Sequence, residues 1–216
     1  RPVPEGTKIE RLGESQFRLH GRDVETPKFA IVDIETTGLK FDRDQILQIA
    51  VVVQDWTVPA TTTVTPTSVW STYVRPPQWW NRELGPQHVH GISRRKLIFA
   101  PSTEKAMRSF AQQTKGHIVV AHNADFDTKF LRAAAHLHNI DLEWAGVVCT
   151  LNLSRKLDPQ RQQTHKLSTL CEKYGVTLNH AHHAEYDARA TAELLPHLLN
   201  AHKIQNLEEL QPFVRS

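Results

Sequence analysis

Four carboxylates and one histidine follow each other along the chain in an order that suits metal binding and activation of water. The acids are Asp33, Glu35, Asp127 and Asp187, and His182 lies shortly before the last of them. Acidic side chains gathered in one site repel each other unless cations lie between them. Histidine suits the role of a base because its ordinary pKa is about 6.5. The set therefore predicts a two-metal centre with a histidine base beside it.

The first two acids end an apolar segment. Residues 28–35 read Lys-Phe-Ala-Ile-Val-Asp-Ile-Glu, and this run rich in β-branched residues predicts a buried strand. Residues two apart on a strand point to the same face, so Asp33 and Glu35 should lie together. Thr36 begins a turn that Gly38 completes. A strand end with two solvated acids explains this segment, taken alone, about equally well.

Asp127 belongs to a junction between a strand and a helix. Residues 118–127 read Ile-Val-Val-Ala-His-Asn-Ala-Asp-Phe-Asp, a short apolar strand that runs into a helix with Asn123 placed to cap it. Asp125 and Asp127 then fall near the first turn, where the helix dipole favours negative charge. The alternative is that both aspartates only cap and solvate the helix start.

Asp187 lies near the start of a third helix. Ala190, Leu194 and Leu198 recur at the spacing of an amphipathic helix. We expect Pro196 to kink this helix or to end it near Leu195.

Histidines before that helix leave a zinc site open as an alternative. His180, His182 and His183 are clustered in the sequence. Cys149 and Cys171 are the two cysteines of the chain, and neither belongs to a paired metal-binding motif. The zinc interpretation therefore has little support.

The three segments together resemble the exonuclease motifs of the DEDDh family. They read Asp-Ile-Glu-Thr-Thr-Gly, His-Asn-Ala-Asp-Phe-Asp and His-His-Ala-Glu-Tyr-Asp-Ala in this order. The similarity extends over roughly residues 28–200 and is greatest to the proofreading epsilon subunit and exonuclease domain of bacterial DNA polymerase III. Each motif is moderately specific alone, and three at compatible separations are much more so.

The resemblance implies which residues act. It selects Asp127 over Asp125, and His182 over His183 or His180. It implies a catalytic role for Asp33, Glu35, Asp127, His182 and Asp187, with the four acids as metal ligands. It also implies substrate contacts from Thr36, Asn123 and His90, because the segment Val-His-Gly-Ile around His90 resembles a loop beside the nucleotide site.

The implied reaction is hydrolysis of the terminal phosphodiester at the 3′ end of single-stranded or frayed DNA, releasing nucleoside 5′-monophosphates in proofreading or repair. Two divalent ions, Mg²⁺ or Mn²⁺, would bind hard oxygen ligands. Asp33, Glu35 and Asp187 would hold one ion, Asp33 would bridge to the second near Asp127, and His182 would deprotonate water. The expected partners are nucleic acid 3′ ends, with DNA preferred over RNA, and a replicative DNA polymerase subunit.

Three other functions compete with this one. RNA or oligoribonucleotide trimming uses the same five residues in relatives, and the sequence does not reveal how the site treats a 2′-hydroxyl. A catalytically silent binding or replicase assembly module is a second candidate, but crowded acids would then have no purpose. A structural metal site is the weakest, because carboxylates without cysteines suit exchangeable magnesium.

Composition agrees with a nucleic acid enzyme. The chain has 216 residues, enough for one domain, and carries 26 lysines and arginines against 23 acids, four of which belong to the proposed site. The remaining surface is therefore basic, which favours a polyanionic substrate. Candidate cations at the rim are Arg94, Arg95, Lys96, Lys129, Arg155, Arg161 and Lys166. No apolar run is long enough to span a membrane and cysteine use is low, so we expect a cytoplasmic protein.

The order of elements predicts an α/β fold. We expect strands near 28–34, 46–56, 69–74, 117–121 and 146–149, and helices near 102–114, 124–138, 150–157, 166–174 and 185–199. The first three strands should form an antiparallel meander to which later strands add in parallel. The resemblance implies a ribonuclease H-like mixed five-stranded sheet flanked by helices.

The same reasoning divides the chain into three parts. Residues 1–27 form an N-terminal extension of unknown role with a possible strand at 16–20, residues 28–202 form the exonuclease domain with a Thr/Pro-rich insertion at about 57–68, and residues 203–216 form a tail packed on that domain. Trp79 and Trp80 are expected to pack in the core rather than stack on bases.

Overall fold

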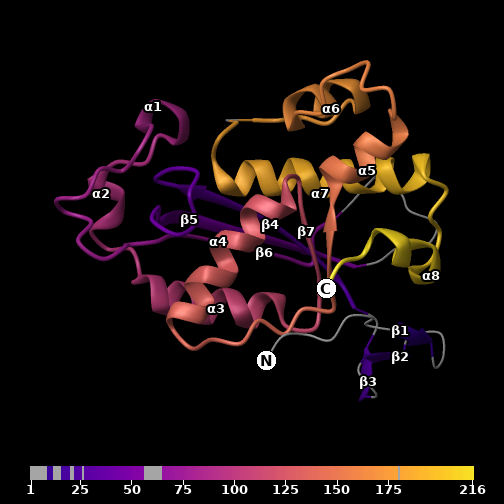
Figure 1. Cartoon of the computed structure of the whole chain (residues 1–216), viewed down its shortest axis with the longest axis horizontal. Coiled ribbons are helices and arrows are strands. Elements are labelled where there is room, and N and C mark those ends of the chain that lie inside the picture. Colours follow the sequence, from indigo (N-terminus) through magenta and orange to yellow (C-terminus); the bar gives the residue numbers. More distant parts are fainter. Residues whose placement is uncertain (1–8, 12–15, 20–21, 26, 56–64, 180) are drawn as a thin grey trace.

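The hydrophobic core packs on both faces of the sheet at the centre of the molecule. The computed structural model describes residues 9–11, 16–19, 22–25, 27–55, 65–179 and 181–216. Five strands run in the order β6-β5-β4-β7-β8 (Figure 1). Their bounds are β4 Phe29–Thr36, β5 Ile46–Gln54, β6 Ser68–Tyr73, β7 Ile118–Ala121 and β8 Gly146–Cys149. Strands β4, β5 and β6 pair antiparallel, and β7 and β8 add in parallel, which confirms the predicted meander with parallel additions.

Helices cover both faces of this sheet. Helices α3 and α4 lie on one face, and α5, α6, α7 and α8 lie on the other (Figure 1). The helical bounds are α1 Gln87–His90, α2 Arg94–Leu97, α3 Thr103–Thr114, α4 Ala124–Leu137, α5 Thr150–Leu157, α6 Leu167–Tyr174, α7 Ala184–Ala201, α8 Leu207–Leu210 and the 3-10 turn η1 Gln211–Phe213. The five longer helices confirm the predicted ones. The sequence did not indicate α1 and α2, which are too short to show a helical period.

Strand β4 alternates between the two hydrophobic clusters. Ala30 and Val32 pack with α3 and α4, whereas Phe29 and Ile31 pack with α7. Because side chains alternate along a strand, the row that begins with Phe29 and Ile31 continues through Asp33 and Glu35. The strand thus directs both acids toward the layer that contains α7.

Helix α7 does not end where Pro196 was expected to end it. It continues through Pro196 to Ala201. Proline lacks the N–H that would bond to the carbonyl four residues earlier, here that of Ala192. The side-chain Nε2 of Gln54 lies 3.5 Å from this carbonyl oxygen and donates to it. Of the two predicted outcomes, a kink or an end near Leu195, the helix end was therefore wrong, and a donor from the neighbouring strand β5 reaches the carbonyl that Pro196 leaves free.

The N-terminal strands form a sheet of their own. Strands β1 (Ile9–Arg11), β2 (Gln16–Leu19) and β3 (Arg22–Glu25) pair antiparallel in sequence order. The strand predicted at 16–20 is confirmed as β2, while β1 and β3 were not predicted. His180 and residues 57–64 of the predicted insertion lie outside the described residues.

The C-terminal residues return to the main sheet. Leu207 and Leu210 are buried in the cluster that contains α7. Asn206 caps α8 by accepting a hydrogen bond from the N–H of Glu209 at 2.9 Å. Arg215 and Val147 exchange two backbone hydrogen bonds of 2.9 Å, so the chain end lies along β8. Among the described residues, none of the helices has both the length and the apolar character needed to cross a bilayer.

Candidate active site

Three carboxylates converge where β4 ends and α7 begins. One oxygen atom from each of Asp33, Glu35 and Asp187 lies within 4.8 Å of the others. Asp187 is 9% exposed, and its Oδ2 accepts a hydrogen bond from the N–H of His182 at 3.0 Å. Its Oδ1 is buried and has no hydrogen-bond partner among the described residues. A buried carboxylate oxygen left without a donor fits a divalent cation, because Mg²⁺ and Mn²⁺ bind hard oxygen ligands.

Asp127 approaches these acids from the other layer. It lies in the first turn of α4 and is 4% exposed. The backbone N–H groups of Asp127 itself and of Ile34 in β4 lower the pKa of this carboxyl group, which places it beside the strand that carries Asp33 and Glu35. The four predicted acids are thus brought together from one strand and two helices on opposite faces of the sheet.

Burial raises the pKa of all four carboxyl groups, and repulsion from neighbouring acids raises it further at Asp33, Glu35 and Asp127. Burial is the largest cause at Asp33, where Asp127, Asp187 and Glu35 raise the pKa further. Burial, then Asp187, raises the pKa of Glu35 to about 7. Burial also raises the pKa of Asp127 to about 7, against the two N–H donors that lower it. At Asp187 burial again dominates, and the His182 N–H opposes it. Bound cations would relieve this electrostatic cost.

The two histidines before α7 have different surroundings. His182 is exposed, and its φ of +69° is uncommon for a residue with a side chain. The bond from its N–H to Asp187 holds this backbone conformation. The ring Nε2 of His183 instead lies 3.3 Å from Nε2 of Gln48, and the ring packs against Tyr186 with centroids 5.0 Å apart. His182 is therefore the one of this pair that solvent reaches readily.

Gln48 is a site-forming residue that sequence reasoning missed. It is buried in β5 directly opposite Glu35. Its Oε1 accepts a hydrogen bond of 3.4 Å from the N–H of Ala184, the first residue of α7. Gln48 thus joins the sheet to the start of α7, which follows His182 and carries Asp187. The available signal was a lone glutamine within the apolar run Ile-Leu-Gln-Ile-Ala-Val-Val-Val.

Thr36, His90 and Asn123 take different places around the site. The Thr36 hydroxyl donates to the carbonyl oxygen of Gly38 at 2.6 Å, inside the turn after β4. Asn123 is exposed at the N-cap position of α4, but its side chain makes no capping hydrogen bond. Asn123 thus occupies the predicted N-cap position of α4 but does not form the predicted capping hydrogen bond.

His90 is buried in its own loop. Its Nδ1 accepts from the N–H of Ile92 at 3.0 Å, so Nε2 carries the proton and donates to the carbonyl of Leu84 at 2.9 Å. Burial is the main cause that lowers the pKa of His90. Both ring nitrogens are occupied within the loop, so the side chain fixes the loop's shape.

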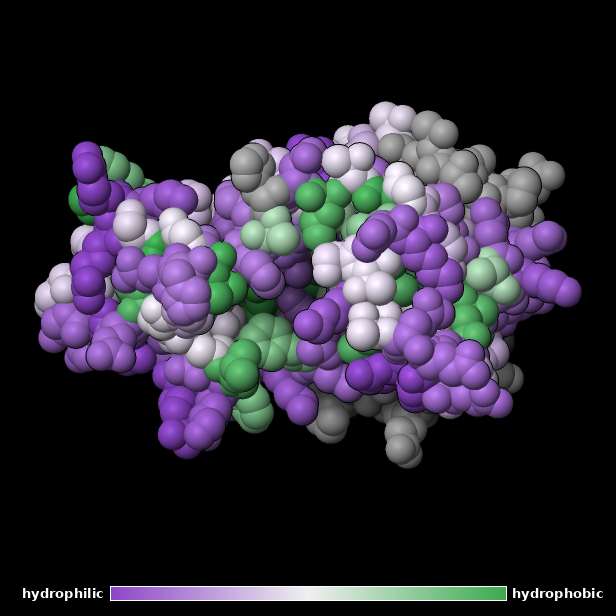
Figure 2. Space-filling view, turned by 90° about the horizontal axis from the view of Figure 1, so that it is seen from above, coloured by the Kyte–Doolittle hydropathy of each residue, from purple (hydrophilic) through white to green (hydrophobic). Residues whose placement is uncertain are grey.

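This loop packs directly on the turn that follows β4. Gly85 has a φ of +73°, and a Cβ at that position would collide with the carbonyl oxygen of Thr37. Before the loop, Trp79 is partly buried against a small hydrophobic cluster, whereas Trp80 is 63% exposed, so core packing was wrong for Trp80. Figure 2 shows a hollow on the face seen from above, between the part of the molecule with α1 and α2 and the rest.

Sequence comparison relates the chain to nucleases. A profile of the exonuclease family RNase_T matches residues 30–195. The DNA polymerase III PolC-type of Caldanaerobacter subterraneus subsp. tengcongensis is 35% identical over 202 residues, which cover 92% of this chain and 12% of that protein. The 3′-5′ exonuclease DinG of Staphylococcus epidermidis is 33% identical over 172 residues, covering 77% of this chain and 17% of that protein. The chain thus spans less than a fifth of these relatives.

Solved structures share the fold. Escherichia coli exonuclease I in complex with a dT13 oligonucleotide superposes with a TM-score of 0.66 at 18% identity, covering 86% of this chain and 46% of that one. The nuclease domain of 3′hExo, a DEDDh family member bound to rAMP, also gives 0.66 at 16% identity, covering 83% and 94%. The fold is ribonuclease H-like, as predicted. Because the family profile covers more than half of its length, this chain belongs to the RNase_T family of exonucleases.

Proposed function

We propose that this chain is a metal-dependent 3′-to-5′ exonuclease that removes nucleoside 5′-monophosphates from the 3′ end of single-stranded or frayed DNA. The observation that carries the proposal is the convergence of Asp33, Glu35 and Asp187 within 4.8 Å. Four crowded acids with raised pKa values cost stability, because burial opposes the ionisation of each carboxyl group. Such a cluster is typical of a site that binds cations for catalysis.

The acids act as ligands in this proposal. Asp33, Glu35 and Asp187 would hold one divalent ion, and Asp33 together with Asp127 would hold a second. Two Mg²⁺ or Mn²⁺ ions would supply a water of lowered pKa and would neutralise charge on the attacking and leaving oxygens. The buried Oδ1 of Asp187, which has no donor among the described residues, is the ligand atom that the structure supports most directly.

His182 acts as the general base in this proposal. Its side chain is exposed, so it can take a proton from water and release it to solvent. Asp187 positions it by accepting its backbone N–H. In this proposal Asn123, exposed at the start of α4, the turn held by Thr36 and the loop shaped by His90 would border the space in which the terminal nucleotide binds.

DNA is the substrate that we favour. The relatives include a DNA polymerase and the exonuclease DinG, and one structural neighbour is in complex with dT13. Another neighbour holds rAMP, so trimming of RNA is the rival to be tested. We further propose a role in proofreading or DNA repair, a replicative polymerase as partner, and a cytoplasmic location.

The test is a digestion assay on matched DNA and RNA single strands that carry a label at the 3′ or the 5′ end. Reactions contain Mg²⁺, Mn²⁺ or EDTA, and the variants are His182→Ala and His183→Ala. We expect stepwise loss from the 3′ end of DNA that stops in EDTA. Loss of the general base should slow cleavage about 10²- to 10⁴-fold. His183→Ala should retain most of the activity.

Each other outcome would revise a defined part of the proposal. A strong preference for RNA would move the protein to RNA trimming. Equal losses in the two histidine variants would remove His182 from its assigned role. The absence of metal-dependent cleavage with either polymer would favour a binding or assembly module.

A further inference from the structure

A second hollow, not lined by the four acids, lies between α5 and the end of the chain. Its volume is about 260 Å³, and Cys149, Leu153 and Phe213 form part of its apolar wall. Four further residues that line it are cationic: Arg155, Lys156, Arg161 and Arg215. All four are exposed. The pocket therefore presents positive charge around a small hydrophobic base.

Most of this charge is not neutralised. Arg215 pairs with Asp125 at 2.6 Å. The Lys156 ammonium lies 4.3 Å from the centroid of the Phe213 ring, an arrangement that leaves its charge intact. Within the part of the chain that the structure describes, Arg155, Lys156 and Arg161 form no ion pair with a carboxylate. An anion entering the pocket would meet three such cations.

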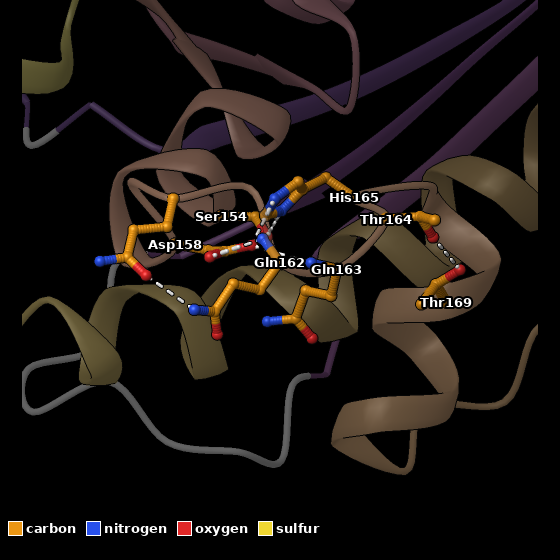
Figure 3. Close-up of polar contacts among 8 residues, drawn as sticks. Ser154, Asp158, Gln162, Gln163, Thr164, His165 and Thr169 are labelled. Atoms are coloured by element: carbon orange, nitrogen blue, oxygen red, sulfur yellow. Dashed lines mark hydrogen bonds and ion pairs between the residues drawn. The ribbon is translucent and has the colours of Figure 1, made fainter.

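The loop that carries Arg161 is held in place by hydrogen bonds within the loop itself. Arg161 has a φ of +54°, and its N–H donates to the carbonyl of Asp158 at 3.0 Å. The Asp158 carboxylate accepts the N–H groups of Gln162 and Gln163 at 3.1 and 3.2 Å (Figure 3). These bonds fix the turn on which Arg161 lies.

His165 ties this turn to α5. Its Nε2 lies 3.2 Å from Asp158, and its Nδ1 lies 2.8 Å from the hydroxyl of Ser154 on α5 (Figure 3). His165 and Ser154 are both buried. Arg161 is thus presented from a fixed turn beside the helix that carries Arg155, which lowers the entropic cost of binding a ligand between them.

The pocket lies near the acid site. The ion pair of Arg215 ends on Asp125, two residues before Asp127. The Arg155 guanidinium, after burial, lowers the pKa of His122, which directly precedes Asn123. Strand β8, which ends at the pocket, is two positions from β4 in the sheet, or roughly 10 Å at the usual strand spacing.

We propose that this pocket binds backbone phosphates of the nucleic acid strand whose 3′ end occupies the acid site. The inference rests on the proposed function, since the strand must leave an acidic site and cross the adjoining surface. Cations that are fixed and unpaired suit phosphate oxygens. The Phe213 ring already contacts the Lys156 ammonium and the His202 ring, whose centroid lies 4.8 Å from that of Phe213, so we expect the pocket to receive phosphates rather than a stacked base.

The test compares the double variant Arg155→Ala/Arg161→Ala with a control, Lys105→Ala/Arg108→Ala, that removes the same charge from α3 on the opposite layer. Binding of a 5′-labelled 12-nucleotide single strand is measured by fluorescence anisotropy in EDTA at several salt concentrations. Each lost phosphate contact should reduce the salt slope by about 0.7. We expect five- to tenfold weaker binding for the pocket variant only.

Kinetics with Mg²⁺ provide the second readout. The KM for the 12-nucleotide strand should rise five- to tenfold with kcat unchanged. Hydrolysis of the p-nitrophenyl ester of thymidine 5′-monophosphate should stay the same, because this substrate is too short to reach the pocket.

Several results would overturn the inference. One is an equal loss of strand affinity in the pocket and control variants. Another is an equal loss of activity on the long strand and on the short ester, and a third is unchanged strand binding in the pocket variant. Weaker binding of a labelled hexaglutamate peptide, with strand binding intact, would assign the pocket to an acidic peptide. If wild-type protein cleaved neither substrate but the salt slope still fell in the pocket variant, the exonuclease proposal would fail and the strand-binding pocket would stand.

Discussion

Asp125 and Asp127 lie two residues apart at the start of α4 and have opposite surroundings. Asp125 is exposed and pairs with Arg215, whereas Asp127 is 4% exposed and held against β4. Asp127→Asn should lower kcat about 10²- to 10³-fold, because it removes charge next to the other acids. Asp125→Asn removes the same charge and should change kcat less than about threefold. Single-turnover cleavage with saturating Mg²⁺ measures both, and equal effects would show that the wrong aspartate has been assigned.

The raised pKa values make stability without metal depend on pH. The pKa of the Glu35 carboxyl rises from its ordinary 4.5 to about 7, and that of Asp127 from 3.8 to about 7. Between these values the folded chain holds more protons than the unfolded chain. The free energy of unfolding contributed by these groups therefore falls as pH rises from about 4 to 7. Bound Mg²⁺ should restore it most at high pH, where the acids are ionised.

The variant Glu35→Gln separates the pH dependence caused by Glu35 from an opposing pH dependence caused by His122. Burial lowers the pKa of His122 to about 4, which makes its contribution to stability rise with pH up to the ordinary histidine value. Thermal unfolding in EDTA should therefore compare wild type with Glu35→Gln from pH 5 to 8. The Tm of the wild type should fall relative to that of the variant as pH rises. A constant difference would contradict the raised pKa of Glu35.

Among the elements, the junction between β5 and α7 decides how the site is assembled. Gln48→Leu would leave the buried N–H of Ala184 without its acceptor and loosen the start of α7, which follows His182 and carries Asp187. We expect a loss of about 1 to 3 kcal/mol in stability and a roughly tenfold fall in kcat. Gln54→Leu is the matched control, since Gln54 is buried on the same strand and contacts α7 at Ala192. It should affect stability but not kcat, measured by urea unfolding and single-turnover cleavage. Equal kcat losses would rule out the positioning role of Gln48.

The sequence predicted the main elements because their patterns are local. The apolar runs of β4, β5, β7 and β8 and the helical periods were each legible within a few residues. The spacing of Asp33 and Glu35 on one strand also fixed their common face. Contacts between segments far apart in the sequence could not be predicted from such local patterns. The bond from Gln54 to the carbonyl that Pro196 leaves free and the bond from Gln48 to Ala184 both join residues more than 130 positions apart.

The division of the chain into three parts remains a prediction. The family profile ends at residue 195, before α7 ends and before the tail begins. The residues after His202 nevertheless contribute buried side chains to the same cluster as β4 and α7.

At the scale of the whole molecule, these C-terminal residues contribute to stability. Leu210 is fully buried against the layer that contains α7. Leu210→Ala should lower the free energy of unfolding by about 2 to 5 kcal/mol, through lost burial and the cavity that remains. Glu208→Ala, on the exposed side of the same short helix, should change it by less than about 0.5 kcal/mol. Urea denaturation compares them, and similar values for the two variants would show that the tail is not part of the cooperative core.

The four acids come from both layers of the molecule, with Asp127 on α4 and Asp187 on α7 at opposite faces of the sheet. Neither layer contains a complete set. On the proposed mechanism, a chain still emerging from the ribosome, or one whose second layer has opened, would lack part of the ligand set and could not degrade nucleic acid. Requiring both sides of the sheet would then make cleavage a property of the finished fold and would protect nucleic acids from incompletely folded copies of the protein.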